Sequence, residues 1–244
     1  MSKPIVFLHG WGQSKQVWYR QMEAFPDAIF LDLPGHGTNH EEETNTSDWV
    51  ESIAAQLPDQ PSVIVGWSLG GMIAMQLALQ CPEKIAALVL ISTTPSFCHQ
   101  KNWAFGCSHE WFEAFESGIK NNTSKTISRF FALMLHGDDM HRSEYNQIAK
   151  KAIDTSIQPS TETLRTGLDY LATTDLRKTL KNIQQPTLIL HGDNDAIIPA
   201  SAGQSIAESI PHAIYHLFKQ CGHAPFLTQH TTFNETVETW CLKI

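Results

Sequence analysis

The most restrictive feature of the chain is a serine held between glycines, Gly66-Trp67-Ser68-Leu69-Gly70. Residues 62–65 before it are a short, mostly β-branched run, and residues 69–80 after it have helical character. A serine on a sharp strand-to-helix turn needs small neighbours two positions away, for steric reasons. The turn brings the hydroxyl to a helix N-terminus, where free N–H groups favour a developing oxyanion. The pattern therefore predicts a serine nucleophile on an α/β sheet.

The rest of the chain alternates continuously apolar runs with amphipathic stretches. Strands are expected over residues 4–9, 28–32, 62–67, 86–91, 187–191 and 213–218. Apolar strands that alternate with helices predict a mostly parallel sheet with helices on both faces. Helices alone are expected between them near 108–118, 124–135, 142–156 and 161–173. We therefore expect an α/β core of residues 1–95 and 176–244, with an inserted helical cap of residues 96–175.

Two later loops supply the partners that a serine nucleophile needs. Such a serine requires a base within hydrogen-bond reach, and a carboxylate orients that base. His191-Gly192-Asp193-Asn194-Asp195 follows one late strand, and Cys221-Gly222-His223 follows the last one. Because both loops leave the carboxyl ends of parallel strands, they converge at one edge of the sheet. We expect His223 as the base and Asp195 as the acid; Asp193 is the alternative acid, expected instead to close its own turn.

The loop after the first strand, His9-Gly10-Trp11-Gly12, is placed to help stabilise an oxyanion. We expect the oxyanion hole to consist of the backbone N–H groups of Trp11 and Leu69. A core role for the Trp11 indole is the alternative, and the two roles are compatible. His9, His36 and His40 could be combined into a metal site, but their spacing fits no standard ligand pattern. We therefore expect neither a metal nor a cofactor.

Composition narrows the class of protein. Seventeen Lys+Arg against twenty-five Asp+Glu give a net charge of −8, which argues against a duplex nucleic-acid binder. The N-terminus lacks a signal-like pattern, and no apolar window is long enough to span a membrane. Five irregularly spaced cysteines indicate free thiols in a reducing compartment. We expect a cytoplasmic, monomeric protein.

Together these motifs carry a family likeness. Through residues 9–12, 32–37, 66–70 and 192–199 the chain resembles the α/β-hydrolase superfamily over almost its full length. More narrowly, it is similar to the pimeloyl-acyl-carrier-protein methyl ester carboxylesterases of biotin synthesis. The narrower resemblance rests on His-Gly-Trp-Gly, Gly-Trp-Ser-Leu-Gly-Gly, Arg129-Phe130-Phe131-Ala132-Leu133, Thr174-Asp175-Leu176-Arg177 and His223-Ala224-Pro225-Phe226. It implies a serine esterase that removes the methyl ester from a pimeloyl chain carried by an acyl-carrier protein.

The same resemblance implies which residues contact the acyl chain: Trp11, Ser68, Leu69, Phe130, Phe131, Ala132, Leu133, Met134 and His223. An apolar helical face over the serine would hold a methylene chain, with each buried CH₂ contributing about 0.8 kcal/mol. The alternative for residues 130–134 is an ordinary core face of a cap helix.

Carrier proteins are acidic, so their docking surface should be basic. Residues 120–151 contain six Lys/Arg and three Asp/Glu, a net of +3, which leaves −11 for the rest of the chain. The candidates for docking are Lys125, Arg129, Arg142, Lys150 and Lys151. Arg129 and Arg142 match arginines of the family, whereas Lys125 replaces one and the uncharged Asn146 stands at another position. A merely solvated helical face is the alternative.

Three other functions remain open from the sequence. The same triad serves short-chain carboxylesterases and thioesterases acting on small-molecule esters, and it also serves ring-fission hydrolases that cleave C–C bonds. A hydrolase fold can also bind a ligand without turnover, although the complete triad argues against this possibility.

Overall fold

The computed structural model describes residues 3–39, 46–153 and 158–244. Within them, six strands form one sheet in the order β2-β1-β3-β4-β5-β6, and every neighbouring pair is parallel. The strands are β1 Ile5–Leu8, β2 Ile29–Leu31, β3 Ser62–Trp67, β4 Ile85–Ile91, β5 Thr187–Gly192 and β6 Ala213–Phe218. All six lie where strands were predicted, and the α/β fold class is confirmed.

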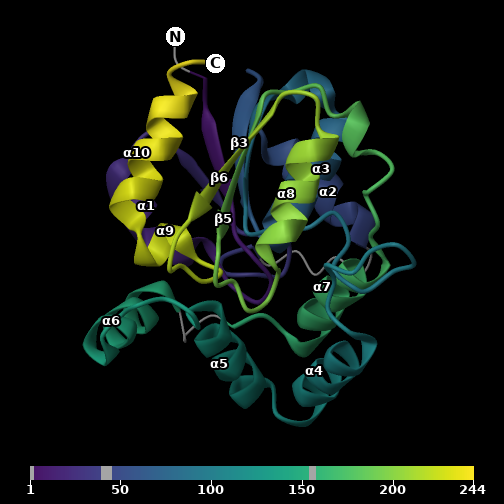
Figure 1. The fold of residues 1–244 in the computed structure, drawn as a ribbon, viewed down its shortest axis with the longest axis vertical. Helices are drawn as coiled ribbons and strands as arrows, with labels where there is room; N and C mark the ends of the chain where they lie inside the picture. Colours follow the sequence, from purple (N-terminus) through teal and green to yellow (C-terminus); the bar gives the residue numbers. More distant parts are fainter. Residues whose placement is uncertain (1–2, 40–45, 154–157) are drawn as a thin grey trace.

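Helices cover both faces of the sheet, as the continuously apolar strands require (Figure 1). One face carries α1 Tyr19–Ala24, α9 Pro225–Thr228 and α10 His230–Cys241; the other carries α2 Thr46–Gln56, α3 Leu69–Gln80 and α8 Ala200–Ser209. Short 3₁₀ helices occupy Lys15–Trp18, Pro82–Lys84 and Leu180–Asn182. The central strand β3 is buried along its whole length, whereas the edge strand β6 alternates between half-buried and exposed residues.

Four helices lie between β4 and β5, where the sequence predicted helices alone. They are α4 His109–Asn121, α5 Thr123–Met134, α6 Arg142–Ala152 and α7 Thr161–Thr173. Figure 1 shows α4, α5 and α6 beyond the end of the sheet that is opposite the two termini. The side chains of Ser108, Asn122 and Ser160 cap α4, α5 and α7 by accepting hydrogen bonds from the first turns. The last part of the helix predicted over 142–156 falls on residues 154–157, outside the described residues.

The chain leaves and re-enters the sheet layer at adjacent points. Leu176 donates a 2.8 Å backbone hydrogen bond to Pro95, and Ser96 and Asp175 form an isolated antiparallel bridge. These contacts lie where the predicted boundaries between core and cap were drawn, at 95/96 and 175/176, although the division into core and cap stays a prediction. No described helix combines the length and apolar character needed to cross a bilayer.

Candidate active site

Ser68 occupies the turn between β3 and α3 in a backbone conformation that residues other than glycine rarely adopt, with φ 55° and ψ −116°. Such a conformation costs on the order of 1–3 kcal/mol and requires support from its surroundings. Support comes from the Ser68 N–H, which donates to the Ile91 carbonyl at 2.9 Å, and from the Thr93 hydroxyl, which donates to the Ser68 carbonyl at 2.7 Å. The backbone of Ser68 is thus held in this conformation by β4 and the loop after it.

The flanking glycines are required by close packing. A Cβ on Gly66 would lie 2.4 Å from the Gly70 carbonyl oxygen. A Cβ on Gly70 would lie 2.5 Å from the carbonyl oxygens of Leu8 and His9. Backbone atoms cannot retreat as a flexible side chain can, so any larger residue would push α3 away from the end of β1. The sequence interpretation of this motif therefore has its steric basis in the structure.

The loops after β5 and β6 meet at a buried histidine–aspartate pair. His223 Nδ1 lies 2.7 Å from Asp195 Oδ2, and neither side chain is exposed. The other Asp195 oxygen accepts backbone hydrogen bonds from Ile197 and Ile198, both at 2.9 Å. Asp195 is therefore fixed by its own loop and oriented toward His223.

Asp193 lies in a different environment. One of its oxygens accepts a 3.3 Å hydrogen bond from the Cys221 N–H, and the other lies 3.7 Å from the Lys219 Nζ. It joins the two loops near the surface and forms no described contact with the His223 ring. Of the two candidate acids, the structure thus brings Asp195 to the histidine.

A second histidine, His191, also contacts the acid. Its Nε2 lies 3.2 Å from Asp195 Oδ2 and 2.9 Å from the Ile198 carbonyl oxygen. Burial acts to raise the pKa of Asp195, but the neighbouring His223 and His191 outweigh it and hold that pKa well below its usual range. Sequence reasoning assigned no role to His191, since only its His-Gly-Asp context was visible. The sequence did offer one indication: His191 is the last but one residue of β5, the strand that leads into the loop of Asp195.

The histidine loop is joined to the serine turn and to the cap through backbone contacts of His223. The Trp67 indole donates to the His223 carbonyl at 2.9 Å, and the His223 N–H donates to the Met134 carbonyl at 2.9 Å. Its Nε2 atom is buried and has no hydrogen-bond partner among the described residues. This ring nitrogen is therefore available to accept a proton, while the rest of the residue is held in place.

The loop after β1 lies directly beside the serine. A Cβ on Gly10 would be 3.3 Å from the Ser68 Cβ, so the backbone that leads into Trp11 runs past the serine side chain. Neither the Trp11 nor the Leu69 N–H donates any of the turn and loop hydrogen bonds found between described residues. His9 supports the loop because its Nε2 accepts from the Leu33 N–H at 3.0 Å, and burial lowers the pKa of His9. The two N–H groups are free for an oxyanion, and that role stays a prediction.

The Trp11 side chain joins the core loop to the cap. Its indole N–H donates to the Leu164 carbonyl of α7 at 2.9 Å, and its ring meets Phe115 and Phe130 edge-on, with centroids 5.2 and 5.4 Å away. The side chain is 2 % exposed. The indole thus serves as a core aromatic group, which was the alternative role, and it is compatible with an oxyanion role for the backbone of the same residue.

Beyond this aromatic cluster lies a cavity of about 260 Å³ between α4 and α5. This volume approaches the roughly 300 Å³ at which small-molecule pockets begin. Its wall is mainly apolar and includes Trp111, Ala114, Phe115, Gly118, Thr126, Arg129, Phe130 and Leu133. Trp111 and Phe115, whose rings stack at 5.1 Å, were not among the predicted contacts. Their spacing of four residues on a helix was the signal that could have identified them.

The segment predicted to hold the acyl chain divides between several environments. Phe130 and Leu133 line the cavity. Phe131 instead faces Tyr145 of α6, with ring centroids 6.3 Å apart, and Ala132 is exposed on the helix surface. Met134 is buried and contacts His223 through its carbonyl oxygen. Only part of the segment therefore faces the cavity, because successive helical residues point about 100° apart.

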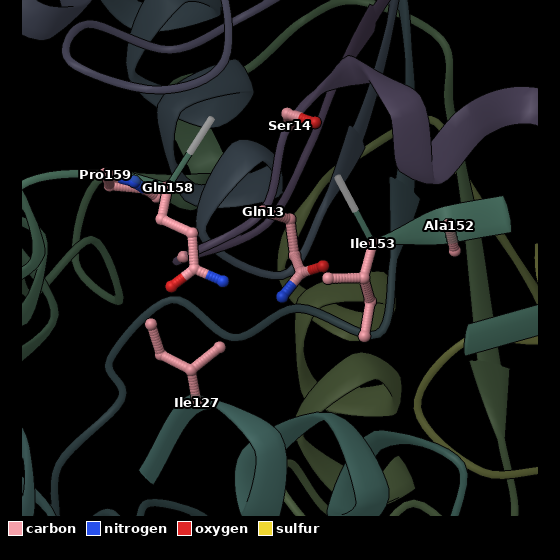
Figure 2. Close-up of a pocket in the computed structure, with 8 residues that line it drawn as sticks. Gln13, Ser14, Ile127, Ala152, Ile153, Gln158 and Pro159 are labelled. Atoms are coloured by element: carbon pink, nitrogen blue, oxygen red, sulfur yellow. The ribbon is translucent and has the colours of Figure 1, made fainter. Parts of the chain in front are cut away.

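A second hollow separates the loop after β1 from α5 and α6. Figure 2 shows the side chain of Gln13 projecting into it from the loop after β1 and those of Gln158 and Ile127 projecting into it from the cap. Its wall combines the two amides with apolar side chains such as Ile127 and Ile153. Gln13 is 6 % exposed, so this polar group is enclosed between the core and the cap.

The five residues predicted for carrier docking are all exposed. Lys125 and Arg129 lie on α5, whereas Arg142, Lys150 and Lys151 lie on α6. None of them forms an ion pair with another described residue, although the Lys151 ammonium lies 5.4 Å from the centre of the Tyr19 ring. The cap thus presents these five basic residues at the surface of two helices, α5 and α6.

No group of three histidine, cysteine or acidic side chains is arranged to hold a metal ion in the part of the chain that the structure describes. His9 and His36 do lie together, with ring centroids 5.2 Å apart. His40, the third member of the metal site considered from the sequence, lies outside the described residues.

Comparison with known proteins identifies the family. The model of the α/β-hydrolase fold family matches residues 3–229. The chain belongs to the α/β-hydrolase family. Two curated relatives of this hydrolase are named pimeloyl-[acyl-carrier protein] methyl ester esterase. The relative from Nitrosomonas europaea is 37% identical, with 92% of this chain and 90% of the relative covered. That from Vibrio parahaemolyticus is 35% identical, with 94% and 90% covered.

A solved structure gives independent support for the fold of this hydrolase. The esterase from Exiguobacterium antarcticum superposes with a TM-score of 0.86 at 21% identity, over 99% of this chain and 93% of that one. At this identity the likeness concerns the fold alone. The resemblance to the pimeloyl methyl ester carboxylesterases inferred from short motifs is confirmed by the relatives over nearly the whole chain.

Proposed function

We propose that this hydrolase is a serine carboxylesterase that removes the methyl ester from pimeloyl-acyl-carrier protein during biotin precursor synthesis. The observation that carries the proposal is the buried His223–Asp195 pair at 2.7 Å, joined through Trp67 to the strained Ser68 turn. This arrangement occurs in a chain 37% identical to a relative named for that activity. The site suits acyl transfer, because a nucleophile, a base and an orienting acid come from loops that follow the carboxyl ends of β3, β6 and β5 at one edge of the sheet.

In the mechanism we propose, the Ser68 hydroxyl attacks the ester carbonyl carbon while His223 Nε2 accepts its proton. The oxyanion of the tetrahedral intermediate is bound by the N–H groups of Trp11 and Leu69, each contributing about 3–4 kcal/mol. The bond from the carbonyl carbon to the methoxy oxygen then breaks while His223 gives its proton to that oxygen, so methanol leaves and an acyl-enzyme remains. A water molecule gives a proton to His223 as it attacks this acyl-enzyme. His223 then returns that proton to the Ser68 oxygen as the acyl–serine bond breaks, and the product is a free carboxylate. Asp195 holds the imidazole in the required orientation throughout.

The cap supplies the proposed recognition. We assign the methylene chain to the wall formed by Phe130 and Leu133 beside Trp11, which agrees with the apolar cavity there. The acidic carrier protein would dock on the exposed basic residues of α5 and α6, at the solvent side of the same helices. In this arrangement the thioester that links the acyl chain to the carrier protein stays outside the active site, while the methyl ester at the other end of the chain reaches Ser68.

We place the protein in the cytoplasm as a monomer that consists of a core of residues 1–95 and 176–244 and a cap of residues 96–175. The reducing compartment is supported by the five cysteines, all of which are free thiols. The monomer is supported by the site itself, since one chain provides every group that the mechanism uses.

The test is release of methanol from pimeloyl-carrier-protein methyl ester by the wild-type protein and by Ser68→Ala. We expect turnover by the wild type and a loss of at least about 10⁴-fold in the variant, because no other group can form the acyl-enzyme. Circular dichroism of the variant checks that it is folded. Methanol release by folded Ser68→Ala would contradict the mechanism. Release of the carrier thiol in place of methanol would identify a thioesterase instead.

A further inference from the structure

Two cysteines outside the active site lie together where the chain passes from β4 into the cap. The Sγ atoms of Cys98 and Cys107 are 3.8 Å apart. Cys98 is 2 % exposed, and Cys107 is half-buried. Cys81, Cys221 and Cys241 belong to other parts of the fold, and the structure gives none of them a cysteine partner. The five cysteines therefore comprise one close pair and three residues that lie apart from it.

The backbone already holds this pair in a geometry that suits a disulfide. Residues 98 and 107 form an isolated parallel bridge, in which the His99 N–H donates to the Cys107 carbonyl at 2.9 Å and the Cys107 N–H donates to the Phe97 carbonyl at 2.8 Å. Paired strands are about 4.8 Å apart, which is inside the roughly 4.4–6.8 Å between Cα atoms that a disulfide spans. Gly106 permits this approach, since a Cβ there would lie 2.4 Å from the Cys98 carbonyl carbon.

From this geometry we infer that Cys98 and Cys107 form a reversible intramolecular disulfide when the protein meets a low-molecular-weight disulfide such as oxidised glutathione. One protein thiolate attacks a sulfur of the small disulfide, which releases one small thiol and leaves a mixed disulfide. The second protein thiolate then attacks the protein sulfur of that mixed disulfide and releases the second small thiol. Two protein thiols are thus oxidised, and one small disulfide is reduced to two thiols.

The environment of the pair favours this exchange over reaction at the other cysteines. The hydrogen bond shared by the two thiols lowers the pKa of Cys98, and burial opposes that effect only in part; the same hydrogen bond, together with burial, raises the pKa of Cys107. By contrast, burial raises the pKa of Cys81, Cys221 and Cys241, so these three form thiolates less readily. Cys107 provides the access, because it is the more exposed member of the pair.

The disulfide would act on the cap. It closes the loop of residues 98–107, and Phe97, the residue just before that loop, has its ring centroid 6.2 Å from that of Trp111 of α4. Trp111 stacks on Phe115, and Phe115 meets Trp11 at 5.2 Å. Ser96, two residues before Cys98, is bridged to Asp175, the point where the chain returns from the cap. A cross-link here restricts the junction through which α4 is attached to the core, so oxidation should slow opening of this junction.

The test treats the folded protein with oxidised glutathione, quenches with acid, labels the remaining thiols with N-ethylmaleimide and digests with trypsin. Lys101 lies between the two cysteines, so cleavage after it leaves two peptides that only a disulfide joins. We expect this linked pair, three labelled cysteines instead of five, and full recovery of all five labels after dithiothreitol. Five labels on the treated protein, or a linkage between other cysteines, would overturn the proposal.

Matched variants complete the test. Cys98→Ser and Cys107→Ser should each stop at the mixed disulfide with glutathione, whereas Cys241→Ser should form the linked pair as the wild type does. Thermal unfolding of each variant establishes that it is folded before oxidation. Hydrogen exchange then examines the junction: amides of residues 97–107 should exchange at least about tenfold more slowly in the oxidised protein. Equal exchange rates in a protein that carries the disulfide would overturn the proposed effect on the cap.

Discussion

At the scale of single residues, the chemistry depends on which acid reaches the histidine. The sequence contained two candidates separated by one residue, Asp193 and Asp195. The structure separates them through the backbone: Ile197 and Ile198 donate to Asp195, whereas Cys221 donates to Asp193. The loop after β5 therefore brings the Asp195 carboxylate, and not that of Asp193, to the His223 ring.

This difference gives a prediction with a built-in control. Asp195→Asn should reduce kcat by about 10³–10⁴-fold, because an amide at this position favours the wrong imidazole tautomer and cannot balance the imidazolium. Asp193→Asn should change kcat by less than about tenfold, since it affects only a hydrogen bond between loops. The measurement is steady-state hydrolysis of a short p-nitrophenyl ester by both variants. Equal losses would contradict the assignment of the acid.

Residue-scale prediction from the sequence worked where a motif carries its own steric logic. The glycines around Ser68 and the loop positions of Asp195 and His223 were predicted because each follows the end of an apolar strand. His191 was missed because its contact with Asp195 depends on how the acid loop turns back, and the spacing of residues does not reveal that turn. The same reason kept the choice between Asp193 and Asp195 open.

At the scale of elements, α5 is the helix on which the proposed functions converge. Its exposed side carries Lys125 and Arg129, and Phe130 on its inner side contacts the Trp11 ring. The end of α5 and the turn after it are held by the loops after β6 and β5: the His223 N–H donates to the Met134 carbonyl at 2.9 Å, and the Asn194 amide donates to the Gly137 carbonyl at 2.9 Å. A displacement of α5 would therefore be felt directly at the candidate base.

These element-scale contacts could be predicted only in part from the sequence. Amphipathic periodicity located α4, α5, α6 and α7, because each buries one face against its neighbours. It could not orient them, since the contact between Met134 and His223 joins residues far apart in the chain. For this reason the predicted acyl-contact segment was treated as one face, whereas Phe130 and Phe131 meet different helices.

At the scale of the whole molecule, two buried histidines link stability to pH. Burial lowers the pKa of His36 to about 3, and burial also lowers the pKa of His9. A buried neutral histidine binds fewer protons in the folded state than in the unfolded state, where its pKa is about 6.5. Its contribution to stability is therefore complete above pH 6.5 and is lost as the pH falls toward 3.

We predict that the free energy of unfolding decreases between pH 7 and pH 5, with His36 contributing up to about 1.4 kcal/mol per pH unit at the acidic end and His9 acting in the same direction. Urea denaturation at both pH values measures the decrease. His36→Gln should show a smaller decrease than the wild type, because its side chain does not titrate. If the two proteins lose the same free energy over this range, His36 is not the linked group.

The distribution of charge is also a whole-molecule property. The net charge of −8 is the sum of −11 over the rest of the chain and +3 over residues 120–151. The five docking candidates of that basic stretch are exposed on α5 and α6. The sequence identified the basic stretch but could not determine whether its charges were neutralised. Among the described residues, none of the five docking candidates forms an ion pair.

The most direct test of carrier-linked esterase activity is the ratio of two kcat/KM values, for pimeloyl-carrier-protein methyl ester and for the free methyl ester. Wild-type protein should prefer the carrier-linked ester, and Arg142→Glu combined with Lys150→Glu should reduce that ratio at least about tenfold at low salt. Lys181→Glu, an exposed charge reversal on the core, is the control and should leave the ratio unchanged. A wild-type ratio near one, or a ratio that survives reversal of the α6 charges, would contradict the account.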